Sequence, residues 1–99
     1  MISIKIHKTY RSVVAVCDSD LIGKKFEEGI RQLDLRENFY KEQELDKEKA
    51  VQIIQQQANE DATFNIVGKK SIQAAIKAGI ITEKDVDTIQ NIPFTLTLL

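Results

Sequence analysis

The chain has 99 residues, of which 42% are hydrophobic and 29% are charged, and its formal net charge is −1 at pH 7. This length predicts a single domain over residues 1–99, and the nearly balanced charge gives no overall attraction to nucleic acids or membranes. One cysteine excludes an internal disulfide, and there is neither a membrane-length apolar run nor a signal-peptide pattern, so we expect a cytoplasmic protein.

Two strands are predicted at the N-terminal end of the chain. Ile2, Ile4 and Ile6 alternate with polar residues, which indicates a half-buried strand. Residues 13–17 form an apolar, largely β-branched run that is typical of a more central strand. The short connection at residues 9–11 predicts that the two strands form a hairpin.

The segment after this hairpin gives weaker signals. Two glycines six positions apart, with Phe26 between them, predict an irregular loop at residues 23–29. Ile30, Leu33 and Leu35 then suit a third strand, although their alternation is imperfect.

Two amphipathic helices and a buried strand form the middle of the chain. Asp46 is a good N-cap for a helix over about residues 46–58, which carries apolar residues on one side and glutamines and charges on the other. Residues 63–67 favour a strand, Gly68 permits a turn, and a second helix is predicted over residues 69–78.

The chain ends with extended structure. Thr82 suits the cap of a helical turn, and a short strand is predicted near residues 86–89. A last strand runs from Phe94 to Leu98, with Pro93 at its start. We therefore predict an α+β fold, with two main helices packed on a small mixed or antiparallel sheet that the N-terminal hairpin and the last strand share.

The most suggestive local feature is the junction formed by Gly68, Lys69, Lys70 and Ser71. It places backbone N–H groups, two ammonium groups and a hydroxyl at a predicted helix start, a combination that suits a phosphate or another anion. The junction lacks the glycine spacing of a P-loop, and a solvated glycine turn is the alternative interpretation.

A second Gly-Lys-Lys sequence adds Lys24 and Lys25 to this candidate anion-binding or RNA-binding set. If the fold brings both sequences together, they form a patch that contacts backbone phosphates. Lysines such as Lys47 and Lys49 are expected to matter less, because they do not lie beside free N–H groups. Aromatic residues make up only 6% of the chain and no stacking motif is visible, so we expect contacts to phosphates rather than to bases.

The residues that most often carry out catalysis do not form a recognisable arrangement. Asp18 beside Cys17 disfavours a thiolate, and pairing across the predicted hairpin sets His7 nearer Ser12 or Val13 than Cys17. Neither a zinc-ligand nor a calcium-loop spacing is present. We therefore assign no catalytic or metal-binding residue and expect no cofactor.

Short motifs over nearly the whole chain resemble the archaeal domain-of-unknown-function family DUF 424. In order, they are Cys17-Asp18, Leu21, Gly23-Lys24, Phe26, Glu28-Gly29, Phe39-Tyr40, Asn65 to Gly68, Ala78 to Ile81, and Ile92-Pro93. The resemblance implies a small archaeal cytoplasmic protein. It brings no established activity, cofactor or catalytic residue, and a link to the translation machinery is a hypothesis.

Three functions follow from these observations, in decreasing order of support. The first is a non-enzymatic binding module that contacts structured RNA or a ribonucleoprotein through the lysines. The second is a protein–protein adaptor that uses an exposed strand edge or the aromatic pair Phe39 and Tyr40, which we predict to lie in a turn or at an edge. The third is a small enzyme, and no membrane partner is expected.

Overall fold

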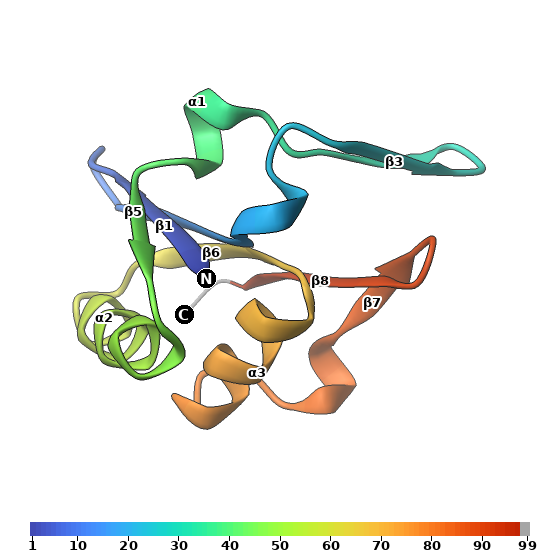
Figure 1. Cartoon of the computed structure of the whole chain (residues 1–99). Helices are drawn as coiled ribbons and strands as arrows, with labels where there is room; N and C mark the ends of the chain where they lie inside the picture. The colour runs from blue at the N-terminus through green and yellow to red at the C-terminus, as the bar shows by residue number, and fades with distance from the viewer. Residues whose placement is uncertain (98–99) are drawn as a thin grey trace.

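A computed structural model describes residues 1–97, and within them a six-stranded sheet has other elements packed on both of its faces (Figure 1). In chain order, the strands are β1 (Ile2–His7), β2 (Val13–Asp18), β3 (Lys25–Glu28), β4 (Arg31–Asp34), β5 (Gln43–Leu45), β6 (Thr63–Val67), β7 (Asp87–Ile89) and β8 (Ile92–Thr97). The helices are α1 (Glu37–Tyr40), α2 (Lys47–Asn59) and α3 (Lys69–Lys77), and the 3-10 helices are η1 (Ser19–Leu21) and η2 (Glu83–Asp85). The predicted α+β class is confirmed.

The strand order of the large sheet is β5-β1-β2-β6-β8-β7. β1 and β2 form the predicted antiparallel hairpin, in which Ser3 lies opposite Cys17 and His7 lies opposite Val13. β2 and β6 are parallel, whereas β6 and β8 are antiparallel. The N-terminal hairpin and the last strand therefore share one sheet, as predicted, with β6 between them.

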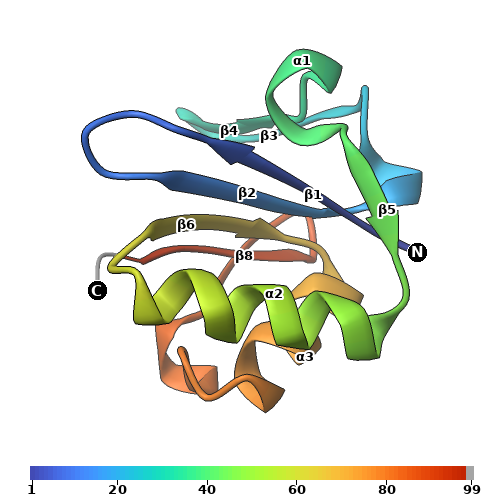
Figure 2. The same cartoon turned by 90° about the vertical axis from the view of Figure 1, so that its left-hand side faces the viewer.

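The two longer helices cover one face of this sheet (Figure 2). α2 begins where predicted, and the Asp46 carboxylate accepts a hydrogen bond of 2.9 Å from the backbone N–H of Lys49. The buried core beneath the helices is built from alternate strand residues and the inner sides of α2 and α3. Its largest fully buried members are Ile2, Ile4, Val14, Val16, Ile54, Phe64 and Ile66.

A second layer covers part of the opposite face. It consists of η1, the β3–β4 hairpin and α1, and its apolar side chains pack on Ala15, Cys17 and Val67 of the central strands. The prediction of a loop at residues 23–29 followed by a single strand is wrong, because β3 and β4 pair with each other across Gly29 and Ile30. Ile30 lies in this turn and is 103% exposed, so it does not belong to a core.

Two further predictions differ in detail. Phe39 and Tyr40 lie in the four-residue helix α1 and not in a turn or at an edge. β8 begins at Ile92, before Pro93, and Leu98 of the predicted last strand lies outside the described residues. No helix within residues 1–97 is long and apolar enough to cross a membrane.

Candidate functional site

The start of α3 is already occupied by a carboxylate of the chain itself. Asp18 ends β2, and its Oδ1 accepts hydrogen bonds from the backbone N–H and the Oγ of Ser71, at 2.8 and 2.7 Å. Its Oδ2 accepts from the backbone N–H of Lys70 at 3.1 Å. The prediction of free N–H groups at Lys70 and Ser71 is therefore wrong, because an internal anion holds the position that we expected a phosphate to take.

The same contact explains the glycine that precedes the helix. Gly68 has φ +108° and ψ 154°, a conformation that is essentially restricted to glycine. A Cβ atom at this position would lie 2.3 Å from Cγ of Asp18. Gly68 is thus required for the close approach of Asp18, and not for the approach of an external ligand.

The lysines beside this junction remain exposed and point to different grooves. Lys70 lines a groove of about 360 Å³ together with Lys47 and Asp46 of the α2 start and with Met1 and Ile2. Lys69 instead lines a groove between α3 and η2. Lys47 was expected to matter less than Lys69 and Lys70, and the fold places it at the same groove as Lys70.

The two Gly-Lys-Lys sequences do not form one patch. Lys24 and Lys25 belong to the layer of η1 and β3, whereas Lys69 and Lys70 belong to the helical layer on the opposite side of the sheet (Figure 1). In addition, Nζ of Lys25 lies 3.4 Å from a carboxylate oxygen of Glu27, and both side chains are more than half exposed. The lysines that the fold does bring together are Lys47 and Lys70.

The aromatic pair does not form an exposed apolar patch. Tyr40 is only 8% exposed and belongs to the second core, and burial raises the pKa of its hydroxyl to about 12. Phe39 stacks on the ring of His7, with a centroid distance of 4.5 Å. Nε2 of His7 lies 2.8 Å from the Phe39 carbonyl oxygen, so this nitrogen carries the proton and donates. Tyr40 is thus buried and Phe39 half-buried, and the suggestion that the two residues make a protein contact stays a prediction.

Cys17 and His7 do not form a catalytic pair. In the β1–β2 register, Cys17 lies opposite Ser3, whereas His7 lies at the far end of β1 opposite Val13. Cys17 is fully buried, and burial, followed by the charges of Asp18 and Asp20, raises the pKa of its thiol to about 12. The thiol is therefore protonated at neutral pH and is not a nucleophile in the folded protein.

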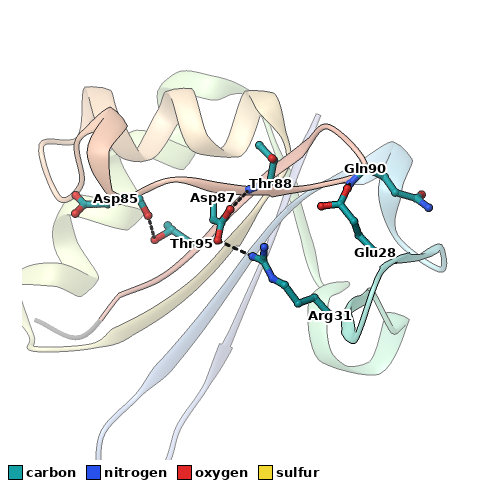
Figure 3. A network of polar contacts seen from close by, with 7 residues as sticks. All are labelled: Glu28, Arg31, Asp85, Asp87, Thr88, Gln90 and Thr95. Carbon is teal, nitrogen blue, oxygen red and sulfur yellow. Dashed lines mark hydrogen bonds and ion pairs between the residues drawn. The ribbon is translucent and has the colours of Figure 1, made fainter.

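A polar network holds the tip of the β3–β4 hairpin against β7 (Figure 3). The guanidinium of Arg31 donates to Asp87 at 2.6 Å and lies 5.5 Å from the ring centroid of Phe94. The backbone N–H of Gln90 donates to a carboxylate oxygen of Glu28 at 3.1 Å. All of these polar groups are exposed, so the network positions the hairpin and does not enclose a site.

A metal site does not assemble from the described part of the chain. Within residues 1–97, no three histidine, cysteine, aspartate or glutamate side chains lie close enough together to hold an ion. Asp18 and Asp46, the two acids at the helix starts, both accept hydrogen bonds from backbone N–H groups. Their role in this fold is to cap helices.

Comparison with known proteins adds a family and a fold. Residues 6–98 match the family described as "Protein of unknown function (DUF424)". No curated protein matches the chain. A solved structure, titled "Crystal structure of an uncharacterized conserved protein from Methanopyrus kandleri", is similar with a TM-score of 0.88 and 24% sequence identity. The match covers 97% of this chain and 89% of that one, and it supports the fold alone.

Proposed function

The chain belongs to the DUF424 family of proteins of unknown function, and from this premise we propose that it is a non-enzymatic module that binds structured RNA or a ribonucleoprotein. The contacts are made to backbone phosphates by lysines at the starts of α2 and α3. The family resemblance adds an archaeal, cytoplasmic setting to this proposal, and an association with the translation machinery is a further hypothesis within it.

The observation that carries the proposal is the shared groove of Lys47 and Lys70. These two lysines come from different helices, and both are exposed. Each lies in the first turn of its helix, where a positive side chain is unfavourable with the helix dipole. Two such lysines, against the single carboxylate of Asp46, leave the groove with a net positive charge that suits a phosphate.

The internal cap at Asp18 changes the kind of contact that we propose. Because this carboxylate already accepts from the N–H groups of Lys70 and Ser71, an external phosphate contacts the lysine side chains there and not these two N–H groups. Lysine ammonium groups bind phosphates as point charges without fixed geometry. The proposal is therefore a salt-sensitive contact with little sequence preference.

The experiment that tests the proposal is a titration of a structured RNA with three proteins. They are the wild type, the variant Lys47→Gln/Lys70→Gln, and a control Lys41→Gln/Lys77→Gln that removes the same charge from exposed lysines elsewhere. The groove variant should bind several-fold more weakly than the control. Equal binding by the two variants would contradict a specific role for the groove.

A second candidate function, that of a protein adaptor, now rests on a sheet edge and not on an aromatic patch. β5 is the outermost strand beside β1, and it carries the exposed residues Gln43 and Glu44. Such an edge can accept an extended segment of a partner. Affinity purification with and without nuclease separates the two functions, because a protein partner that stays bound after nuclease treatment favours the adaptor.

A further inference from the structure

A wide depression lies at the other end of α2 from the lysine groove. It has a volume of about 920 Å³ and is lined by residues 8–12, which connect β1 to β2, and by Gln57, Glu60 and Asp61. Figure 2 shows this loop beside the end of α2, whereas the N-terminus of the chain lies beside the start of α2. A 13-residue helix spans about 20 Å, so the two regions are well separated.

Tyr10 is the unusual residue of this loop. Its side chain is fully exposed, with a relative exposure of 108%, whereas Tyr40 is buried at 8%. An aromatic ring in water gains no packing energy from its own chain, and both of its faces are available for a base to stack on. Lys8, also exposed, lies two positions before it, and residues 1–17 contain three basic and no acidic residues.

The loop is closed on itself by one hydrogen bond across the tyrosine and is tied to the rest of the protein by two hydrogen bonds after it. Thr9 Oγ1 donates to the Arg11 carbonyl oxygen at 2.5 Å, and Arg11 Nε donates to the Asp61 carbonyl oxygen at 2.6 Å. The backbone N–H of Thr63 donates to the Ser12 carbonyl oxygen at 2.9 Å. The ring is therefore presented from an ordered loop, which reduces the entropy cost of binding.

The wall of the depression offers hydrogen-bond acceptors. The carboxylate of exposed Glu60 receives one long hydrogen bond of 3.4 Å from the Gln57 amide, which leaves acceptor positions for other donors. A carboxylate beside a stacking ring suits the exocyclic amino group of adenine, cytosine or guanine, and uracil has no such group. The combination of aromatic ring, lysine and carboxylate therefore matches a nucleotide better than it matches a simple anion.

We propose that the β1–β2 loop binds an unpaired nucleotide of RNA whose base carries an exocyclic amino group, as adenine, cytosine and guanine do. The base stacks on Tyr10, its amino group donates to Glu60, and Lys8 contacts the adjoining phosphate. This inference rests on the proposed RNA-binding function and adds a single-stranded contact to it. It also departs from the expectation, drawn from low aromatic content, that bases are not recognised.

The test uses tetranucleotides, which are short enough to report on this loop alone. Oligo(A), oligo(C) and oligo(U) of four ribonucleotides are titrated while the ring protons of Tyr10 and Tyr40 are followed by NMR. Stacking should move the Tyr10 ring protons upfield and leave those of Tyr40 in place. Tyr10→Ala should weaken binding about 5- to 150-fold, and Tyr10→Phe should retain it.

Two controls separate this inference from the proposed function. Ile30→Ala truncates another fully exposed side chain in a tight turn and should not change tetranucleotide binding. Unchanged binding by Tyr10→Ala, or oligo(U) bound as tightly as oligo(A), would overturn the inference. If structured RNA binds but tetranucleotides do not, only this inference fails, and if the wild type binds neither, both proposals fail.

Discussion

Oδ1 of Asp18 accepts two hydrogen bonds from Ser71, a residue 53 positions later in the chain. The contact forms because β2 and β6 are parallel neighbours, so their C-terminal ends lie at the same edge of the sheet. Asp18 ends β2, and Gly68 follows β6 and begins the turn into α3. The Asp18 side chain thus joins the β1–β2 hairpin to the start of α3.

Asp18→Ala should destabilise the fold. The substitution leaves the N–H groups of Lys70 and Ser71 without their acceptor, and loss of an aspartate cap costs about 0.5–2 kcal/mol. Urea unfolding should show a lower free energy of unfolding than for Asp20→Ala, which removes a neighbouring exposed carboxylate. Equal stability of the two variants would contradict the capping role.

Gly68→Ala should be more destabilising than Gly29→Ala. Both glycines have positive φ, but a Cβ atom at Gly29 has no atom within 4 Å, whereas one at Gly68 meets the Asp18 carboxylate. Forcing alanine into the sparsely populated backbone conformation of Gly68 costs roughly 1–3 kcal/mol by itself. In an Asp18→Ala background the cost of Gly68→Ala should fall, because the clash is gone, and a double-mutant cycle measures this coupling. If the stability losses of Asp18→Ala and Gly68→Ala simply add in the double variant, the close contact between Gly68 and the Asp18 carboxylate is contradicted.

The sequence predicted those elements whose signals are local. The alternation of apolar and polar residues identified β1, and the N-cap residue Asp46 located the start of α2. The glycine turn before α3 was also placed correctly. The β3–β4 hairpin was missed because its turn has only two residues, Gly29 and Ile30. Ile30 was assigned to a strand together with Leu33 and Leu35, whereas it lies in the turn and faces solvent.

The candidate site was harder to predict because it depends on contacts between distant segments. The cap by Asp18 requires the parallel pairing of β2 with β6, and no local pattern specifies that pairing. The same holds for the proximity of Lys47 to Lys70, which follows from the packing of α2 beside α3. Tyr10 and Tyr40 both neighbour charged residues in the sequence, and only the fold shows that one is exposed and the other buried.

The Cys17 thiol should be inert in the folded protein. Its burial and a pKa raised from 9.0 to about 12 keep it protonated and inaccessible, so a maleimide reagent at pH 8 should label it only after unfolding. Cys17→Ala should cost about 1–2 kcal/mol and leave binding of RNA unchanged. Rapid labelling of the native protein, or loss of binding in a folded variant, would indicate a reactive thiol.

The raised pKa of Cys17 also predicts a loss of stability in alkali. Between pH 9 and about 12 the unfolded chain releases the thiol proton while the folded protein retains it, so the free energy of unfolding falls as pH rises. Cys17→Ala should have a shallower decline over this interval. The pKa of Tyr40 is raised for the same reason, so Tyr40 also lowers the free energy of unfolding as pH rises. This second effect should persist in Cys17→Ala.

The ion pair between Arg31 and Asp87 should be detectable as a pKa change. A hydrogen bond from the Thr88 N–H, followed by one from Arg31, lowers the pKa of Asp87 (Figure 3). This contribution to stability is present above the ordinary aspartate pKa and is lost as pH falls through the lowered value. NMR titration of Arg31→Ala should show the pKa of Asp87 moving up, and an unchanged value would contradict the contact.

The salt dependence of RNA binding tests the central claim most directly. Each lysine–phosphate contact releases counterions, so losing two contacts should reduce the slope of log K against log salt concentration by about 1.4–1.8. We predict this change for Lys47→Gln/Lys70→Gln, measured with a structured RNA at salt concentrations from about 50 to 200 mM. The control Lys41→Gln/Lys77→Gln should keep the slope of the wild type. The same slope for both variants, or no RNA binding by the wild type, would contradict a phosphate site at the starts of α2 and α3.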